Sequence, residues 1–141
     1  MHIPMALIAD EANLSQEGKL NVLGAFDRIV SPQFPTVHPK MVFLFRIEAG
    51  YGDGGRKVPV RVRLMDQDGG VLFEAGGEVG APSVKPGEFA TAYQLFGLAG
   101  IRFPGPGQYK FVVNLGDLAP HETPLLVAQG GWSPDVGAAG N

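Results

Sequence analysis

Two segments rich in glycine and aspartate have spacings that occur in ligand-binding sites. Residues 50–55 read Gly-Tyr-Gly-Asp-Gly-Gly and match the G-x-G-x-x-G pattern of dinucleotide-binding loops. That chemistry requires a helix after the loop, because amides at the helix N-terminus bind the pyrophosphate. Here Val58, Pro59 and Val60 follow, which is a strand pattern. We therefore expect residues 50–55 to connect two strands without binding a nucleotide.

Asp66, Asp68 and Gly69 are spaced like the start of a calcium-binding loop, in which carboxylate oxygens coordinate a hard cation. The glutamate that normally ends such a loop is absent, since Gly77 occupies its place. Asp53, Asp66 and Asp68 are calcium candidates only if their loops meet at one end of the fold. The alternative, which we favour, is that Asp66 to Gly69 forms an Asp-Gly hairpin turn.

The other residues that could do chemistry form no motif. His2, His38 and His121 lack the spacing of metal ligands, and no Gly-x-Ser-x-Gly segment points to a nucleophile. The chain has no cysteine, so disulfides and thiolate sites are excluded, which agrees with a reducing compartment. We expect a protein that is not an enzyme and binds no cofactor or transition metal.

Arg61 and Arg63 lie on one face of a predicted strand, where they could bind an acidic partner or the phosphates of nucleic acid. The alternative is a solvated strand face, in which charge also discourages edge-to-edge aggregation. The whole chain has 11 basic and 14 acidic residues and a formal charge of −3. Because it has no basic excess, we expect no nucleic-acid partner.

Asp10 interrupts an apolar run just before a loop. It could be an acid or a ligand at the end of a strand, or its carboxylate could accept backbone amides that hold the connection 13–18. We favour the structural role for Asp10, and likewise for Lys19 and Asn21.

The elements that would position these residues are strands. Residues 57–65 and 108–115 alternate apolar with polar or small residues, the pattern of strands with one buried face. With 21 glycines and 12 prolines, the chain suits turns better than helices. We predict an all-β fold, an antiparallel two-sheet sandwich of about eight strands with immunoglobulin-like architecture, at 3–10, 19–30, 40–49, 56–65, 71–79, 88–98, 108–115 and 124–128. A bulge near Gly97 would explain a change of phase in the strand 88–98.

Residues 40–49 form the strand that departs from simple alternation. Met41, Phe43 and Phe45 would face the core, so Val42 and Leu44 would face outward and need a cover. That cover could be another protomer, the C-terminal tail or the loop 31–39. We predict one domain at residues 1–128 and a flexible tail at residues 129–141, which could dock through Trp132.

Two blocks of the chain are similar to a known family. Ala9-Asp10-Glu11-Ala12 with the segment 18–26, and the segment 104–111 with Pro124-Leu125-Leu126-Val127, resemble a bacterial family of small β-sandwich proteins that is known only as a domain of unknown function. The resemblance spans roughly residues 5–128. It implies the sandwich fold and supplies no activity, ligand or catalytic residue.

We expect a non-catalytic sandwich that binds another protein or associates with itself, with Val42, Leu44, Arg61, Arg63 and Trp132 as interface candidates. The alternative is a sandwich that binds calcium or a small ligand through the loops 50–55 and 66–70. The apolar run 3–9 is too short for a signal peptide or a membrane span, so we expect a cytoplasmic protein without a membrane partner.

Overall fold

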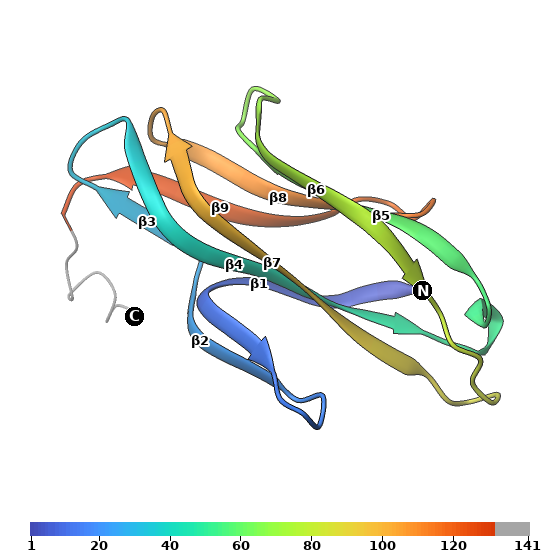
Figure 1. Ribbon diagram of the computed structural model, residues 1–141. Helices are drawn as coiled ribbons and strands as arrows, with labels where there is room; N and C mark the ends of the chain where they lie inside the picture. The colour runs from blue at the N-terminus through green and yellow to red at the C-terminus, as the bar shows by residue number, and fades with distance from the viewer. Residues whose placement is uncertain (132–141) are drawn as a thin grey trace.

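Alternating apolar residues and glycine-rich turns fold this chain into nine strands, seen in a computed structural model that describes residues 1–131 (Figure 1). The prediction of an all-β, two-sheet fold is confirmed, with one strand more than expected. The strands are β1 (His2–Leu14), β2 (Leu20–Phe26), β3 (Arg28–Ser31), β4 (Thr36–Ala49), β5 (Lys57–Met65), β6 (Val71–Gly80), β7 (Ala90–Phe103), β8 (Gly107–Leu115) and β9 (His121–Gln129).

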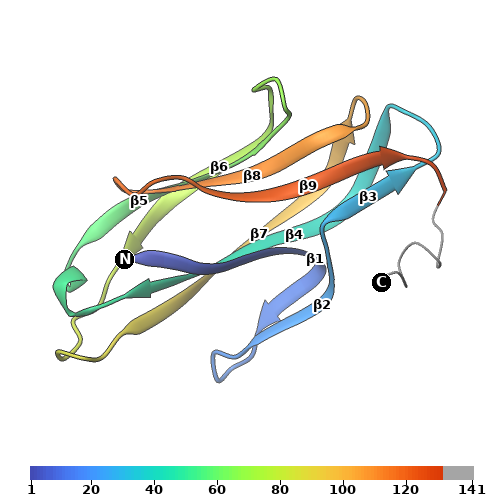
Figure 2. The same ribbon diagram turned by 180° about the vertical axis from the view of Figure 1, so that it is seen from behind.

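The strands form two stacked sheets. Sheet A has four strands in the order β2-β1-β4-β7, and sheet B has five in the order β3-β9-β8-β5-β6. All pairings are antiparallel except that of β3 with β9. Seen from behind, β2 and β3 lead from one sheet into the other (Figure 2).

The prediction of a single strand at 19–30 is wrong, because this segment is divided between the sheets. β2 ends at Phe26 in sheet A, and β3 begins at Arg28 in sheet B. Asp27 between them is exposed, and its carbonyl accepts a hydrogen bond from the amide of Leu126 at 2.9 Å. The apolar pattern continues through the crossing although only β3 has buried residues, Ile29 and Ser31, while no residue of β2 is buried. The sequence therefore does not reveal the change of sheet.

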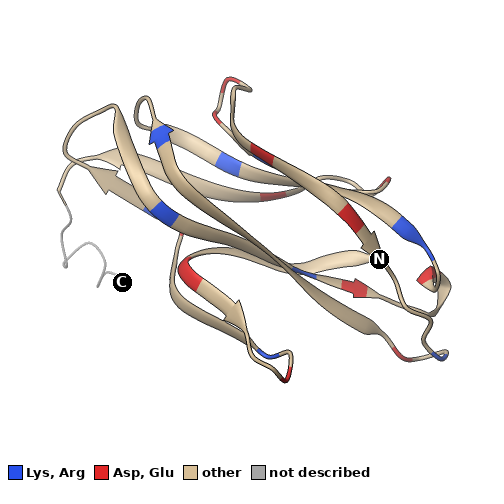
Figure 3. Ribbon diagram, in the orientation of Figure 1, with Lys and Arg blue, Asp and Glu red and all other residues tan. Residues whose placement is uncertain are grey.

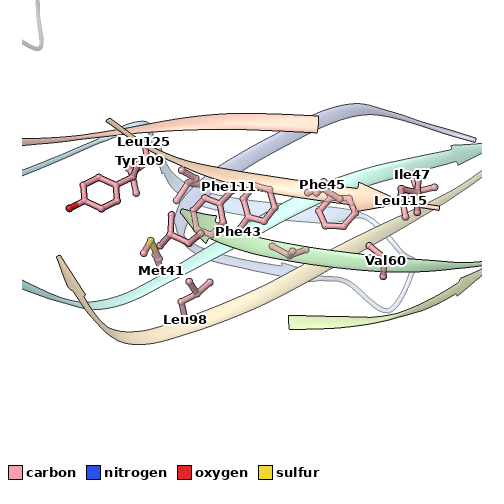
Figure 4. Close-up of a cluster of buried hydrophobic side chains, with 14 of the residues drawn as sticks. Met41, Phe43, Phe45, Ile47, Val60, Leu98, Tyr109, Phe111, Leu115 and Leu125 are labelled. Carbon is pink, nitrogen blue, oxygen red and sulfur yellow. The ribbon is translucent and has the colours of Figure 1, made fainter. Parts of the chain in front are cut away.

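The core lies between the sheets, where β4 packs on β8 (Figure 4). The inward residues of β5 and β8 are those that alternation predicts, with Val62, Leu64 and Phe111 fully buried. Phe43 of β4 stacks on Phe111, with ring centroids 4.3 Å apart. The aromatic pair therefore joins the two sheets near the middle of the sandwich.

The prediction of a bulge near Gly97 is also wrong. The β4–β7 register runs through Gly97 without a shift, and Phe96 and Leu98 face the core while Leu95 faces outward. The apparent change of phase reflects a strand that is apolar on both faces. The ladder is instead interrupted where Pro39 would meet Gly100, whose φ is +64°. Proline has no amide to donate, and glycine adopts the left-handed conformation without strain.

Several strands are longer than predicted. β1 continues to Leu14 because its second half pairs with β2, and β4 begins at Thr36 in spite of Pro39. The hairpin of β1 and β2 extends beyond β4 and projects from the sandwich (Figure 1). No helix within residues 1–131 is long and apolar enough to cross a membrane.

Candidate functional site

The two loops proposed for ligand binding lie at opposite ends of β5. The loop 50–55 precedes this strand and the turn 66–70 follows it, so they are separated by the strand's length of roughly 30 Å. Asp53 is therefore not brought together with Asp66 and Asp68. The alternation of β5 predicts a single continuous strand, and such a strand holds the loops at its two ends apart.

The carboxylates of both loops accept hydrogen bonds from the backbone, Asp66 within its own turn and Asp53 from its own loop and from the N-terminus. Asp53 accepts hydrogen bonds at 2.9 Å from both the Met1 amino group and the Gly50 amide. These bonds, the amino group first, lower the pKa of Asp53 below its usual value. Residues 51–53 form a single 3-10 turn, and the strand follows it as expected.

The segment 66–70 is a hairpin turn, as favoured from the sequence. The Asp66 carboxylate accepts bonds from the amides of Asp68 at 2.9 Å and Gly70 at 2.7 Å. In the part of the chain that the structure describes, no group of three or more His, Cys, Asp or Glu side chains could hold a metal ion. The three calcium candidates thus have no shared ligand cluster.

The outer face of sheet B is charged and internally paired. Arg61 forms an ion pair with Glu74 on the neighbouring β6, and Arg63 donates to the Asn114 side chain on β8 at 3.1 Å. An open groove of about 710 Å³ lies over β8 and β9, and the Lys110–Glu122 ion pair, at 2.8 Å, lines it. The charged groups that line the groove are therefore paired with each other.

Asp10 lies in a polar hollow beside His38 and Gly24. Burial lowers the pKa of His38, and the negative charge of Asp10 acts in the opposite direction. The turn after β1 is held by other groups: Asn21 donates to Asn13 at 3.0 Å, and the Lys19 amide donates to the Ser15 hydroxyl at 3.1 Å. Asp10 thus packs over Gly24. Ser15, and not Asp10, accepts the backbone amide that holds this turn.

The outer face of sheet A has a different character, because its middle is apolar. The register places Leu7 of β1, Leu44 of β4 and Leu95 of β7 in one row across three strands. The next row is formed by Ala9, Val42 and Gly97. Successive side chains of a strand point to opposite faces, so both rows face away from sheet B.

Val42 and Leu44 are buried by their neighbours within the sheet. Leu44 is 0% exposed and Val42 is 7% exposed, yet neither belongs to the core cluster between the sheets. Leu7 and Leu95 flank Leu44 and are themselves partly exposed. Every strand within residues 1–131 belongs to one of the two sheets, so the strands of the described chain form no third layer over this face.

Charged groups border the apolar rows at both ends. At one end Lys40 pairs with Glu11 across β4 and β1, with an N–O distance of 2.6 Å. At the other, Arg46 pairs with Glu48 at 3.0 Å and lies over the ring of Tyr93. Interfaces between proteins commonly have an apolar centre and a polar rim.

The sequence predicts that Val42 and Leu44 face outward, but it does not identify the partly exposed members of the surface, Leu7 and Leu95. Leu7 lies in a run that is apolar on both faces, and Leu95 lies in a strand for which the sequence predicts a bulge that is absent. Pairing three strands in register is what brings them beside Leu44. Trp132, the remaining interface candidate, lies outside the described residues.

The fold and this surface define a class of protein: a small two-sheet β-sandwich with an apolar outer sheet face. The chain belongs to the family of unknown function DUF6941, whose model matches residues 4–128. The resemblance seen in the sequence blocks is thereby confirmed at the level of the family. No curated protein matches the chain.

Proposed function

We propose that the protein is a non-catalytic binding module that contacts another protein chain through the outer face of sheet A. The row of Leu7, Leu44 and Leu95 carries this proposal. Leu7 and Leu95 expose apolar surface at the edges of a buried leucine, so a partner would remove more apolar area from water. The ion pairs at both ends of the row would form the rim of the interface.

The distribution of charge supports a partner that is neither nucleic acid nor strongly charged. Arg61 and Arg63 are engaged by Glu74 and Asn114, and the ends of the sheet A face each carry both signs of charge. A surface of this kind suits another protein with an apolar patch. We place the protein in the cytoplasm, where its lack of cysteine is compatible with a reducing environment.

A matched pair of substitutions tests the surface. Leu7→Lys puts a charge on the outer face of sheet A, and Leu126→Lys does the same on the outer face of sheet B. Both leucines are partly exposed, and each lies on an interior strand of its sheet. Circular dichroism and thermal melting establish that both variants fold.

The measurements are the mass in solution as a function of concentration and the recovery of a specific partner from native cell extract. We expect Leu7→Lys to weaken partner binding at least tenfold and Leu126→Lys to leave it unchanged. Binding that survives Leu7→Lys, or is lost equally in both variants, contradicts the proposal. So does a wild-type protein that neither associates nor recovers a partner.

A further inference from the structure

β7 leaves one long edge of the sandwich unpaired. It has 14 residues, and in the described part of the chain it pairs only with β4. An edge of this length presents a row of backbone amides and carbonyls that can bind another strand. The edge is therefore a second contact surface, distinct from the outer face of sheet A.

The charge on β7 differs from that on β6, the edge of sheet B. β6 carries Glu74 and Glu78, whereas β7 has no charged residue from Ala90 to Ile101 (Figure 3). Features that protect an edge occur only near the end of β7, where the positive φ of Gly100 interrupts the ladder and Arg102 follows. Residues 90–99 remain a regular, uncharged edge.

Side chains on both faces of this segment are only partly buried. Tyr93 and Leu95 lie on the outer face, and Gln94 and Phe96 lie on the core side. The Phe96 ring stacks on Phe45 with centroids 6.0 Å apart, so it forms the margin of the core. A strand added here would cover apolar side chains on both faces at once.

We propose that residues 90–99 of β7 pair antiparallel with the same segment of a second copy of this chain. A two-fold axis perpendicular to sheet A pairs the two edges. It keeps the outer faces of both copies on one side of the joined sheet and their core margins on the other side. Identical strands bring like residues near one another at the axis, where like charges would repel. An uncharged edge matches this requirement, and it offers no counter-charge to an acidic or basic peptide.

The geometry defines the pairing. Leu95 is the middle one of the residues in the segment 90–99 that lie on the outer face. We place it at the two-fold axis, opposite Leu95 of the second copy. Thr91 then lies opposite Ala99 of the second copy. The resulting sheet has eight strands and places the two outer faces side by side, so the two leucine rows meet at Leu95 while Leu7 and Leu44 of each copy stay open. The inference is therefore independent of the proposed function.

Single cysteines test the pairing without background, because the chain has no native cysteine. Residues opposite each other have Cα atoms about 4.5–5.5 Å apart, within reach of a disulfide. We expect Leu95→Cys to form a covalent dimer on mild oxidation. Tyr93→Cys and Gly97→Cys would lie about 14 Å from their copies and should not react. Glu78→Cys on β6 is the control for random collision.

Charge variants test the same pairing by a second route. Thr91→Lys with Ala99→Lys places like charges opposite each other and should weaken dimerisation at least tenfold, measured by sedimentation. Thr91→Glu with Ala99→Lys places opposite charges there and should keep the dimer. Both residues are exposed, so the fold tolerates either pair.

A wild-type protein that is monomeric at high concentration, or cysteines at 95 and 78 that cross-link equally, would overturn the inference. Leu7→Lys separates it from the proposed function. Loss of cross-linking at residue 95 in the Leu7→Lys background would assign the self-contact to the sheet face and reject the edge. Retained cross-linking together with lost partner binding would support both proposals.

Discussion

Phe43 and Phe111 stack nearly parallel across the sandwich, with ring centroids 4.3 Å apart and ring planes at 3°. They come from opposite sheets, and both are 0% exposed. Phe43 also lies between Met41 and Phe45 on the core face of β4. The pair is thus a direct contact between the two sheets in the core.

Removing one ring should therefore be costly. We expect Phe111→Ala to lower the free energy of unfolding by about 3–5 kcal/mol, because it removes buried surface and leaves a cavity. Leu126→Ala, on the outer face of sheet B, should cost far less. Urea denaturation of the two variants measures the difference, and equal losses would contradict this account of the core.

Gly24 should not tolerate a side chain. Its φ is +72°, and an added Cβ would lie 2.5 Å from Oδ2 of Asp10. We expect Gly24→Ala to destabilise the protein by roughly 1–3 kcal/mol, from backbone strain and this contact. Gly18, with a φ of +81° and no atom near its Cβ position, is the matched control for strain alone.

A double-mutant cycle separates the two effects at Gly24. In an Asp10→Ala background the closest contacts, with Oδ2 and Cγ, are gone and only the Cβ atom at 3.2 Å remains, so the cost of Gly24→Ala should fall toward that of Gly18→Ala. The cost of Gly18→Ala should be the same in both backgrounds. If Gly24→Ala lowers the free energy of unfolding by the same amount with and without the Asp10 side chain, the two side chains do not interact.

Asp53 should make stability depend on acid pH. Its pKa is lowered in the folded state, chiefly by the hydrogen bond from the Met1 amino group, from an ordinary value of 3.8. The stabilisation is therefore fully present above that value and is lost as pH falls through the folded pKa. Asp53→Asn should be less stable than wild type at pH 7, and the gap should narrow at pH 3. Denaturation curves at the two pH values measure the gap, and a constant gap would contradict the assignment.

His38 should titrate below the ordinary histidine value of 6.5, because burial disfavours its charged form. The folded protein then binds fewer protons than the unfolded chain between that value and the folded pKa, so stability falls as pH drops through this range. Asp10→Asn removes a charge that opposes the shift and should lower the pKa of His38 further. NMR titration of the His38 ring measures both, and an unchanged pKa in Asp10→Asn would contradict the coupling.

Features that depend on the immediate neighbours of a residue could be predicted from the sequence. Alternation in 57–65 and 108–115 identifies the buried residues of β5 and β8, because successive side chains of a strand point to opposite faces. The Asp-Gly pattern at 66–69 identifies the turn because Asp66 bonds to amides within its own loop. The family resemblance rests on local blocks in the same way.

Only the tertiary structure decides how the strands are combined. The division of 19–30 between two sheets, the separation of Asp53 from Asp66 along β5 and the row of Leu7, Leu44 and Leu95 all depend on pairing between distant segments. A strand that is apolar on both faces, as β7 is, contains no local signal for which face is inward. Which face of β7 is buried depends on the segments that pack against the strand. The pairing of β7 with β4 and of β4 with β1 also brings the candidate surface together.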